Sequence, residues 1–139
     1  MITSLYLLGT VFIVSFFFNL LWEVLHSTLY RTCWEMPFGK VQRLLVIMSL
    51  KDGFWIVSFY ALASFITGVF VPYANTIQMG IFFILCLTFS FIDELLAIKW
   101  QRWEYSDNMP RFLGVGLTPF LELAITGGAA LYVAALLPF

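Results

Sequence analysis

Four long apolar stretches constrain this 139-residue chain more than any other feature of its sequence. They cover residues 3–27, 53–73, 77–99 and 112–137. Each is long enough to cross about 30 Å of hydrocarbon at about 1.5 Å per helical residue. Backbone groups in hydrocarbon must be bonded within their own segment, so each stretch is expected to be a helix. The sequence therefore predicts an all-α fold: an integral membrane four-helix bundle that forms a single transmembrane domain over residues 1–139.

Composition supports this class and excludes others. Hydrophobic residues make up 62% of the chain and charged residues 11%, whereas soluble proteins have about 45–50% apolar and about 25% charged residues. The formal net charge is −1 and the chain has no run of basic residues, so nucleic acid is not an expected partner. Cys33 and Cys86 are expected to stay unpaired, because one lies in a predicted loop and the other inside a predicted span.

The basic residues predict the orientation of the bundle. All seven lie in or beside two loops that precede the second and fourth spans: Arg31, Lys40, Arg43, Lys51, Lys99, Arg102 and Arg111. Loops rich in Lys and Arg face the cytoplasm. We therefore expect a multi-pass protein of the cell's inner (cytoplasmic) membrane, with both basic loops in the cytoplasm and both termini on the non-cytoplasmic side.

The first basic loop contains the segment GKVQRLLVIMSLKDG at residues 39–53, which has two interpretations. Lys40 and Arg43 stand beside an apolar run too short to cross, which predicts a short interfacial helix under the bundle. Alternatively, the second span begins near Leu44 and the segment leads directly into it. Both interpretations remain open at the level of sequence.

Polar and ionisable side chains inside the spans mark a candidate site. On the first span, Asn19, Glu23 and His26 follow the i, i+4, i+7 spacing of one helix face. Counted along each span from its basic loop, these residues and the acids of the other three spans lie in the cytoplasmic half of the bundle, which predicts one shared polar cavity on that side. Acids inside a membrane are expensive to keep and are therefore functional candidates. The acidic set is Glu23, Asp52, Asp93, Glu94 and Glu122.

A cavity with acids and aromatic faces could protonate an olefin and stabilise the resulting cation. In this hypothesis Asp93 or Glu94 is the general acid, Glu23 and His26 act as base or proton relay, and Glu122 is a further catalytic candidate. The expected substrate-binding residues are Asn19, Trp22, Asp52, Trp55, Trp100, Arg102, Trp103 and Tyr105. The alternatives are an interfacial aromatic belt for most of the Trp residues and structural ion pairing for each acid.

Several motifs carry a resemblance. NLLWE at 19–23, Leu29 with Tyr30, DG at 52–53, RWEYSDNMP at 102–110 and GVGLTP at 114–119 follow in this order. The pattern resembles a family of small bacterial four-span membrane proteins, and it implies that fold but no known activity. A weaker resemblance to the membrane lycopene cyclase domain rests on Asp93, Trp103, Tyr105, Gly116, Pro119 and Glu122. That resemblance implies cyclase-like or isomerase-like chemistry on an isoprenoid or lipid.

Two other functional classes stay open. The chain is small enough to be an accessory subunit of a larger membrane complex, a homo-oligomer, or a proton or small-cation transporter. Its expected partners are the bilayer and either a hydrophobic small molecule or the helices of another membrane protein.

A metal site is the last hypothesis. Glu23 and His26 form an E-x-x-H pair, as in carboxylate-bridged dimetal bundles. Because His26 is the only histidine, at most a mononuclear site is expected, from Glu23, His26, Asp93 or Glu94, and Glu122. No other cofactor is predicted.

Overall fold

The computed structural model describes residues 2–137, which fold mainly into helices. Four of them are long and apolar enough to cross a membrane, as predicted: α1 (Ile2–His26), α3 (Phe38–Thr67), α4 (Thr76–Lys99) and α5 (Leu117–Ala135). The 3₁₀ helix η1 (Ser27–Leu29) and the short helix α2 (Arg31–Glu35) connect α1 to α3. An antiparallel hairpin of β1 (Arg111–Phe112) and β2 (Val115–Gly116) precedes α5.

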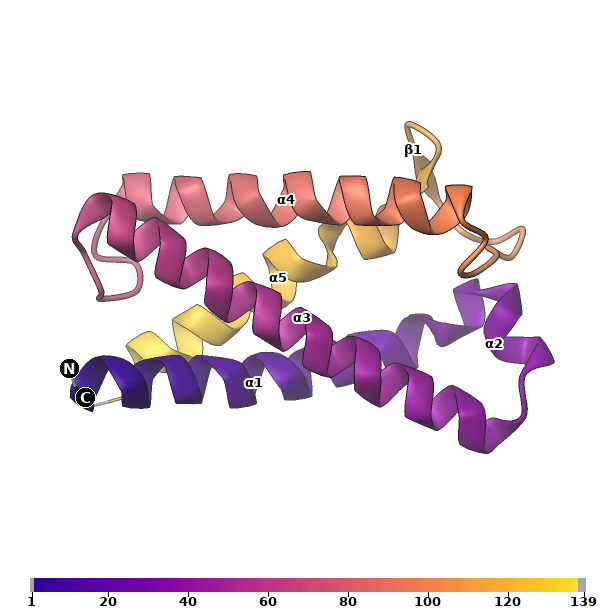
Figure 1. Cartoon of the computed structure of the whole chain (residues 1–139), viewed down its shortest axis with the longest axis horizontal. Helices are drawn as coiled ribbons and strands as arrows, with labels where there is room; N and C mark the ends of the chain where they lie inside the picture. Colours follow the sequence, from indigo (N-terminus) through magenta and orange to yellow (C-terminus); the bar gives the residue numbers. More distant parts are fainter. Residues whose placement is uncertain (1, 138–139) are drawn as a thin grey trace.

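The four long helices form one bundle. Helix α1 packs against α3 and α5, and α4 packs against the same two helices. The beginning of α1 and the end of α5 lie at one end of the bundle, whereas α2 and the β1–β2 hairpin lie at the other (Figure 1). We call the latter the loop end.

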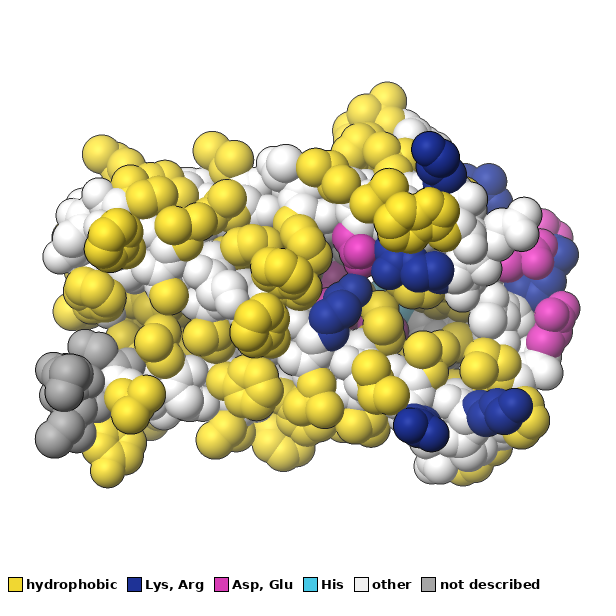
Figure 2. All heavy atoms as spheres, in the orientation of Figure 1, with side chains coloured by type: hydrophobic (Ala, Val, Ile, Leu, Met, Phe, Trp, Pro, Cys, Tyr) yellow, Lys and Arg dark blue, Asp and Glu magenta, His cyan; other side chains and the backbone are white. Residues whose placement is uncertain are grey.

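Charge and apolar surface are distributed unevenly along the bundle. Large apolar side chains such as Phe65 and Ile84 are exposed on its outside, which is the arrangement expected where lipid replaces water around the helices. On the face shown in Figure 2, basic and acidic side chains occupy the half nearer the loop end, and hydrophobic side chains cover the rest. The core of the bundle is closed by fully buried residues such as Ile56, Phe82 and Leu131.

The second predicted span, 53–73, is misplaced. Helix α3 begins at Phe38, directly after Pro37, and runs without a break to Thr67. Residues 39–53 are therefore the first half of this helix, and the separate interfacial helix suggested for that segment does not form. Gly68 ends α3 with a left-handed backbone conformation (φ 69°), which glycine adopts without steric cost.

The fourth predicted span, 112–137, begins five residues too early. Residues 112–116 belong to the β1–β2 hairpin, and α5 starts at Leu117. Pro119 lies in the first turn of α5, where backbone N–H groups have no partner within the helix and a proline is tolerated. The first and third predicted spans agree with α1 and α4 to within one residue at each end.

Candidate carboxylate site

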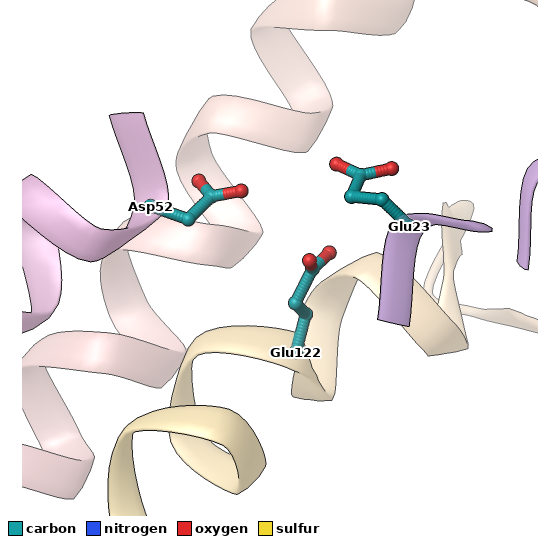
Figure 3. Close-up of side chains that lie close together, drawn as sticks. All are labelled: Glu23, Asp52 and Glu122. Atoms are coloured by element: carbon teal, nitrogen blue, oxygen red, sulfur yellow. The ribbon is translucent and has the colours of Figure 1, made fainter. Parts of the chain in front are cut away.

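Three carboxylates from three helices meet inside the bundle. Glu23 comes from α1, Asp52 from α3 and Glu122 from α5, and one oxygen of each lies within 4.8 Å of the others (Figure 3). Asp52 and Glu122 are each only 7% exposed. Among the residues that the structure describes, no hydrogen bond or ion pair joins these three carboxylates to another side chain. We call Glu23, Asp52 and Glu122 the carboxylate cluster.

A buried hydrogen bond between α1 and α5 holds two members of the cluster opposite each other. Thr126 Oγ1 donates to Asn19 Oδ1 at 2.9 Å, and Asn19 Nδ2 donates to the Ser15 carbonyl at 2.7 Å. Asn19 lies one turn before Glu23, and Thr126 one turn after Glu122. Asn19, expected to bind substrate, is fully buried and instead fixes the register of the two helices.

Glu94 is held by the loop that follows α4. Trp103 Nε1 donates to Glu94 Oε1 at 3.0 Å, and the Tyr105 hydroxyl donates to the same oxygen. The Gly116 backbone N–H donates to the Tyr105 hydroxyl oxygen at 2.8 Å. Burial and the Glu94 carboxylate both raise the pKa of Tyr105, so its hydroxyl keeps the proton that it donates. Within the described residues no group donates to Glu94 Oε2.

Asp93, the other acid of the pair, has a different environment. Consecutive helical residues point about 100° apart, so Asp93 and Glu94 face different neighbours. Asp93 Oδ1 lies 2.9 Å from Arg102 Nη2, and Asp93 Oδ2 lies 2.9 Å from Lys51 Nζ. Arg102 also donates to the Asp93 backbone carbonyl. Asp93 is therefore an ion-paired structural carboxylate, as the alternative interpretation of the acids proposed, and it is poorly suited to the role of general acid.

Of the metal-ligand set suggested by the E-x-x-H pair, the structure brings only Glu23 and Glu122 close together. His26 stacks on Trp22 with ring centroids 4.4 Å apart, and its Nδ1 lies 2.8 Å from the Trp22 carbonyl oxygen. His26 and Asp93 are absent from the group of close ligand atoms, and Asp52 takes their place. Asp52 was expected to bind substrate. Its contribution to the cluster depends on how α3 packs against α1, which spacing along one helix cannot predict.

A polar cavity of about 40 Å³ lies beside the cluster. Its wall includes all three cluster carboxylates as well as Ser90, Glu94 and Trp103. Ser90 Oγ is buried without a hydrogen-bond partner. Sequence reasoning missed this residue, although it lies one turn before Glu94 on the same face of α4.

A second cavity of about 40 Å³ adjoins the first between α2 and α3. Its wall includes the apolar side chains of Leu44, Leu45 and Met48 and the half-buried thiol of Cys33. The two cavities share four wall residues: Glu23, Tyr30, Met48 and Trp103. We call them the polar cavity and the apolar cavity.

The other predicted substrate-binding residues lie outside the wall of the polar cavity. Trp55 packs against Phe59 and Phe89, with centroids 5.5 and 4.5 Å away. Trp100 is 63% exposed, and the Arg102 guanidinium lies over the Trp103 ring at 5.0 Å. Trp55 and Trp100 line neither the polar nor the apolar cavity. Both cysteines are unpaired, as predicted.

Fold and site together define a membrane-type helical bundle with a carboxylate cluster inside it. No family model, curated protein or solved structure matches the chain. The resemblances based on its motifs therefore stay predictions, and the function is argued from the site alone.

Proposed function

We propose that this protein binds a lipid-like amphiphile of isoprenoid type and transfers protons to and from it at Glu94. The supporting observation is that the apolar cavity adjoins the polar cavity through four shared wall residues. An apolar chain entering between α2 and α3 would bury hydrocarbon against Leu44, Leu45 and Met48. Its reacting end would then lie between Glu94 and the carboxylate cluster.

The proposal includes an orientation. Basic side chains lie toward the loop end of the bundle (Figure 2), and such residues remain on the cytoplasmic side when helices insert. We therefore place the loop end, with both cavities, on the cytoplasmic side of the inner membrane. An amphiphile of the cytoplasmic leaflet would enter directly from the bilayer.

Glu94 is the acid best placed for proton transfer. Both of its hydrogen-bond donors bind Oε1, which leaves Oε2 to carry a proton. Asp93 is engaged by two cations, and His26 is not among the residues that line the polar cavity. Ile56 lies one turn after Asp52 on α3, toward the end of the bundle opposite the loop end, and is fully buried. An apolar core at that place supports a binding site open to one side more than a transport path through the bundle.

The chemistry would be a double-bond isomerisation. Glu94 gives its proton to one carbon of an olefin, the π electrons form the new C–H bond, and the neighbouring carbon becomes cationic. Loss of a proton from an adjacent carbon back to Glu94 forms the shifted double bond and restores the acid. The face of the Trp103 ring would stabilise the intermediate positive charge.

Cys33 offers a direct test of binding. Its thiol lines the apolar cavity, whereas Cys86 is fully buried in the bundle. Burial raises the pKa of the Cys33 thiol, so alkylation is best followed at mildly alkaline pH. Geranylgeraniol, added to the purified protein in detergent, should slow alkylation of Cys33 and leave Cys86 unlabelled. Equal labelling rates with and without the alcohol would contradict binding in this cavity.

Two Trp variants on α3 form a matched pair for this experiment. Met48→Trp places a large side chain in the wall shared by both cavities, and it should remove the protection by geranylgeraniol. Leu50→Trp adds the same side chain at an exposed position and should keep the protection.

Proton transfer is tested by incubation in D₂O. Reversible protonation at carbon should exchange hydrogen for deuterium in geranylgeraniol, which mass spectrometry detects after extraction. Glu94→Gln should abolish the exchange and still protect Cys33. Protection without exchange in the parent protein would retain the binding part of the proposal and reject the chemistry.

A further inference from the structure

We infer that Glu23, Asp52 and Glu122 bind a hard divalent cation of the Mg²⁺ or Mn²⁺ class. This inference goes beyond the proposed function and does not depend on the amphiphile, because it concerns an inorganic ligand of the carboxylate cluster. The cluster offers only oxygen atoms, and oxygen ligands select such cations over the softer metals that prefer thiolate or imidazole.

The three oxygen atoms lie close enough for side-chain rotations to bring them onto one cation. All lie within 4.8 Å of one another. Oxygens bound to one Mg²⁺ are about 3 Å apart when they are adjacent and about 4.1 Å apart when they are opposite, so the three carboxylates would have to move closer together on binding. The three side chains extend toward one another from three different helices (Figure 3), so small rotations would bring them onto one ion.

Two buried oxygen atoms without partners point to a ligand at this place. Glu122 Oε1 and Ser90 Oγ are both inaccessible and make no hydrogen bond among the described residues. Their side chains belong to residues that are 7% and 6% exposed and line the polar cavity. Buried polar atoms in proteins are nearly always paired. A cation bound to Glu122, with a water molecule bonded to Ser90, would pair both.

Within residues 2–137, no Lys, Arg or His side chain forms an ion pair with the carboxylate cluster. Lys51 also lines the polar cavity, but its Nζ contacts Asp93 at 2.9 Å. Three charged carboxylates that share no ion pair repel one another in a low-dielectric interior, and a divalent cation would remove that repulsion. The cavity volume of about 40 Å³ exceeds the roughly 10–15 Å³ that one water molecule needs. It leaves room for an ion that retains part of its water shell, as Mg²⁺ usually does.

The test is direct binding of Mn²⁺ to the purified full chain in detergent, without added lipid, after treatment with EDTA and removal of the chelator. Electron paramagnetic resonance measures free Mn²⁺ and therefore gives the number bound and the affinity. We expect one Mn²⁺ per chain, displaced by excess Mg²⁺. Asp52→Asn and Glu122→Gln should each weaken binding by at least about tenfold.

A control addresses adventitious binding at the surface. Glu104 is an exposed carboxylate at the loop end, and Arg31 forms ion pairs with both Glu104 and Asp107. Glu104→Gln should leave the affinity for Mn²⁺ unchanged. Absence of binding by the parent protein would overturn the inference. Equal binding by the parent and both cluster variants, or loss of binding in Glu104→Gln alone, would overturn it as well. Since geranylgeraniol is absent, failure here is distinguishable from failure of the proposed function.

Discussion

The Tyr105 hydroxyl donates a hydrogen bond to Glu94 Oε1 and at the same time accepts one from the Gly116 backbone N–H. This single hydroxyl connects α4 to the segment that leads into α5. The loop from Trp100 to Gly116 is therefore fixed to the end of the bundle by a buried phenol. The relationship also determines which carboxylate oxygen of Glu94 is free to face the polar cavity.

Tyr105→Phe should destabilise the protein. The change removes the donor to Glu94 and leaves the Gly116 N–H without its acceptor, and an unsatisfied buried group costs about 1–3 kcal/mol. Unfolding in mixed detergent micelles measures the loss. Tyr132→Phe is the control, because Tyr132 is 59% exposed and should be neutral. Equal stability of the two variants would show that the hydrogen bonds of Tyr105 contribute nothing.

Asp93→Asn should also lower stability. It leaves Lys51 and Arg102 half-buried without their shared carboxylate, at a cost on the order of 1–3 kcal/mol, between the values for exposed and buried pairs. A double-mutant cycle with Lys51→Met measures the coupling. We expect a positive coupling energy that decreases at high salt, since the pair is partly exposed. Additive effects of the two substitutions would contradict the ion pair.

Glu122→Gln should have the opposite effect when the protein is kept in EDTA. Removing one of three neighbouring carboxylates relieves repulsion, and the free energy of unfolding should rise by roughly 1–3 kcal/mol. Glu23→Gln should behave in the same way. Glu104→Gln removes an exposed carboxylate outside the cluster and should change stability by less than about 1 kcal/mol. A loss of stability in both cluster variants would show that the cluster holds the helices together.

Gly127→Ala should disturb the packing of α5. A Cβ at this position would lie 2.8 Å from Phe82 Cζ and 3.1 Å from Ile56 Cγ1. Overpacking of this kind typically costs about 1–3 kcal/mol. Gly80→Ala on α4 is the matched control, because its Cβ would meet nothing within 4 Å. Unfolding in the same micelles should show a loss for Gly127→Ala and little change for Gly80→Ala.

The sequence predicted the elements of the fold more accurately than their ends. Hydropathy located all four long helices, since a long apolar run needs no knowledge of its neighbours. The start of α3 was missed because Lys40, Arg43 and Lys51 interrupt the apolar pattern, although they remain helical. The start of α5 was missed because the apolar residues of the β1–β2 hairpin extend that pattern beyond the helix.

The composition of the site shows the same division. By itself the sequence determined that acids occur inside apolar helices, which residues they are and that they lie toward one end, because depth follows from counting along a helix. Only the tertiary structure decided which acids meet. Asp93 and Glu94 are neighbours in the chain, yet one contacts Lys51 and Arg102 and the other Tyr105. Asp52 joins Glu23 and Glu122 from a third helix, because helix rotation and register are set by side-chain packing between helices, which periodicity along one helix does not specify.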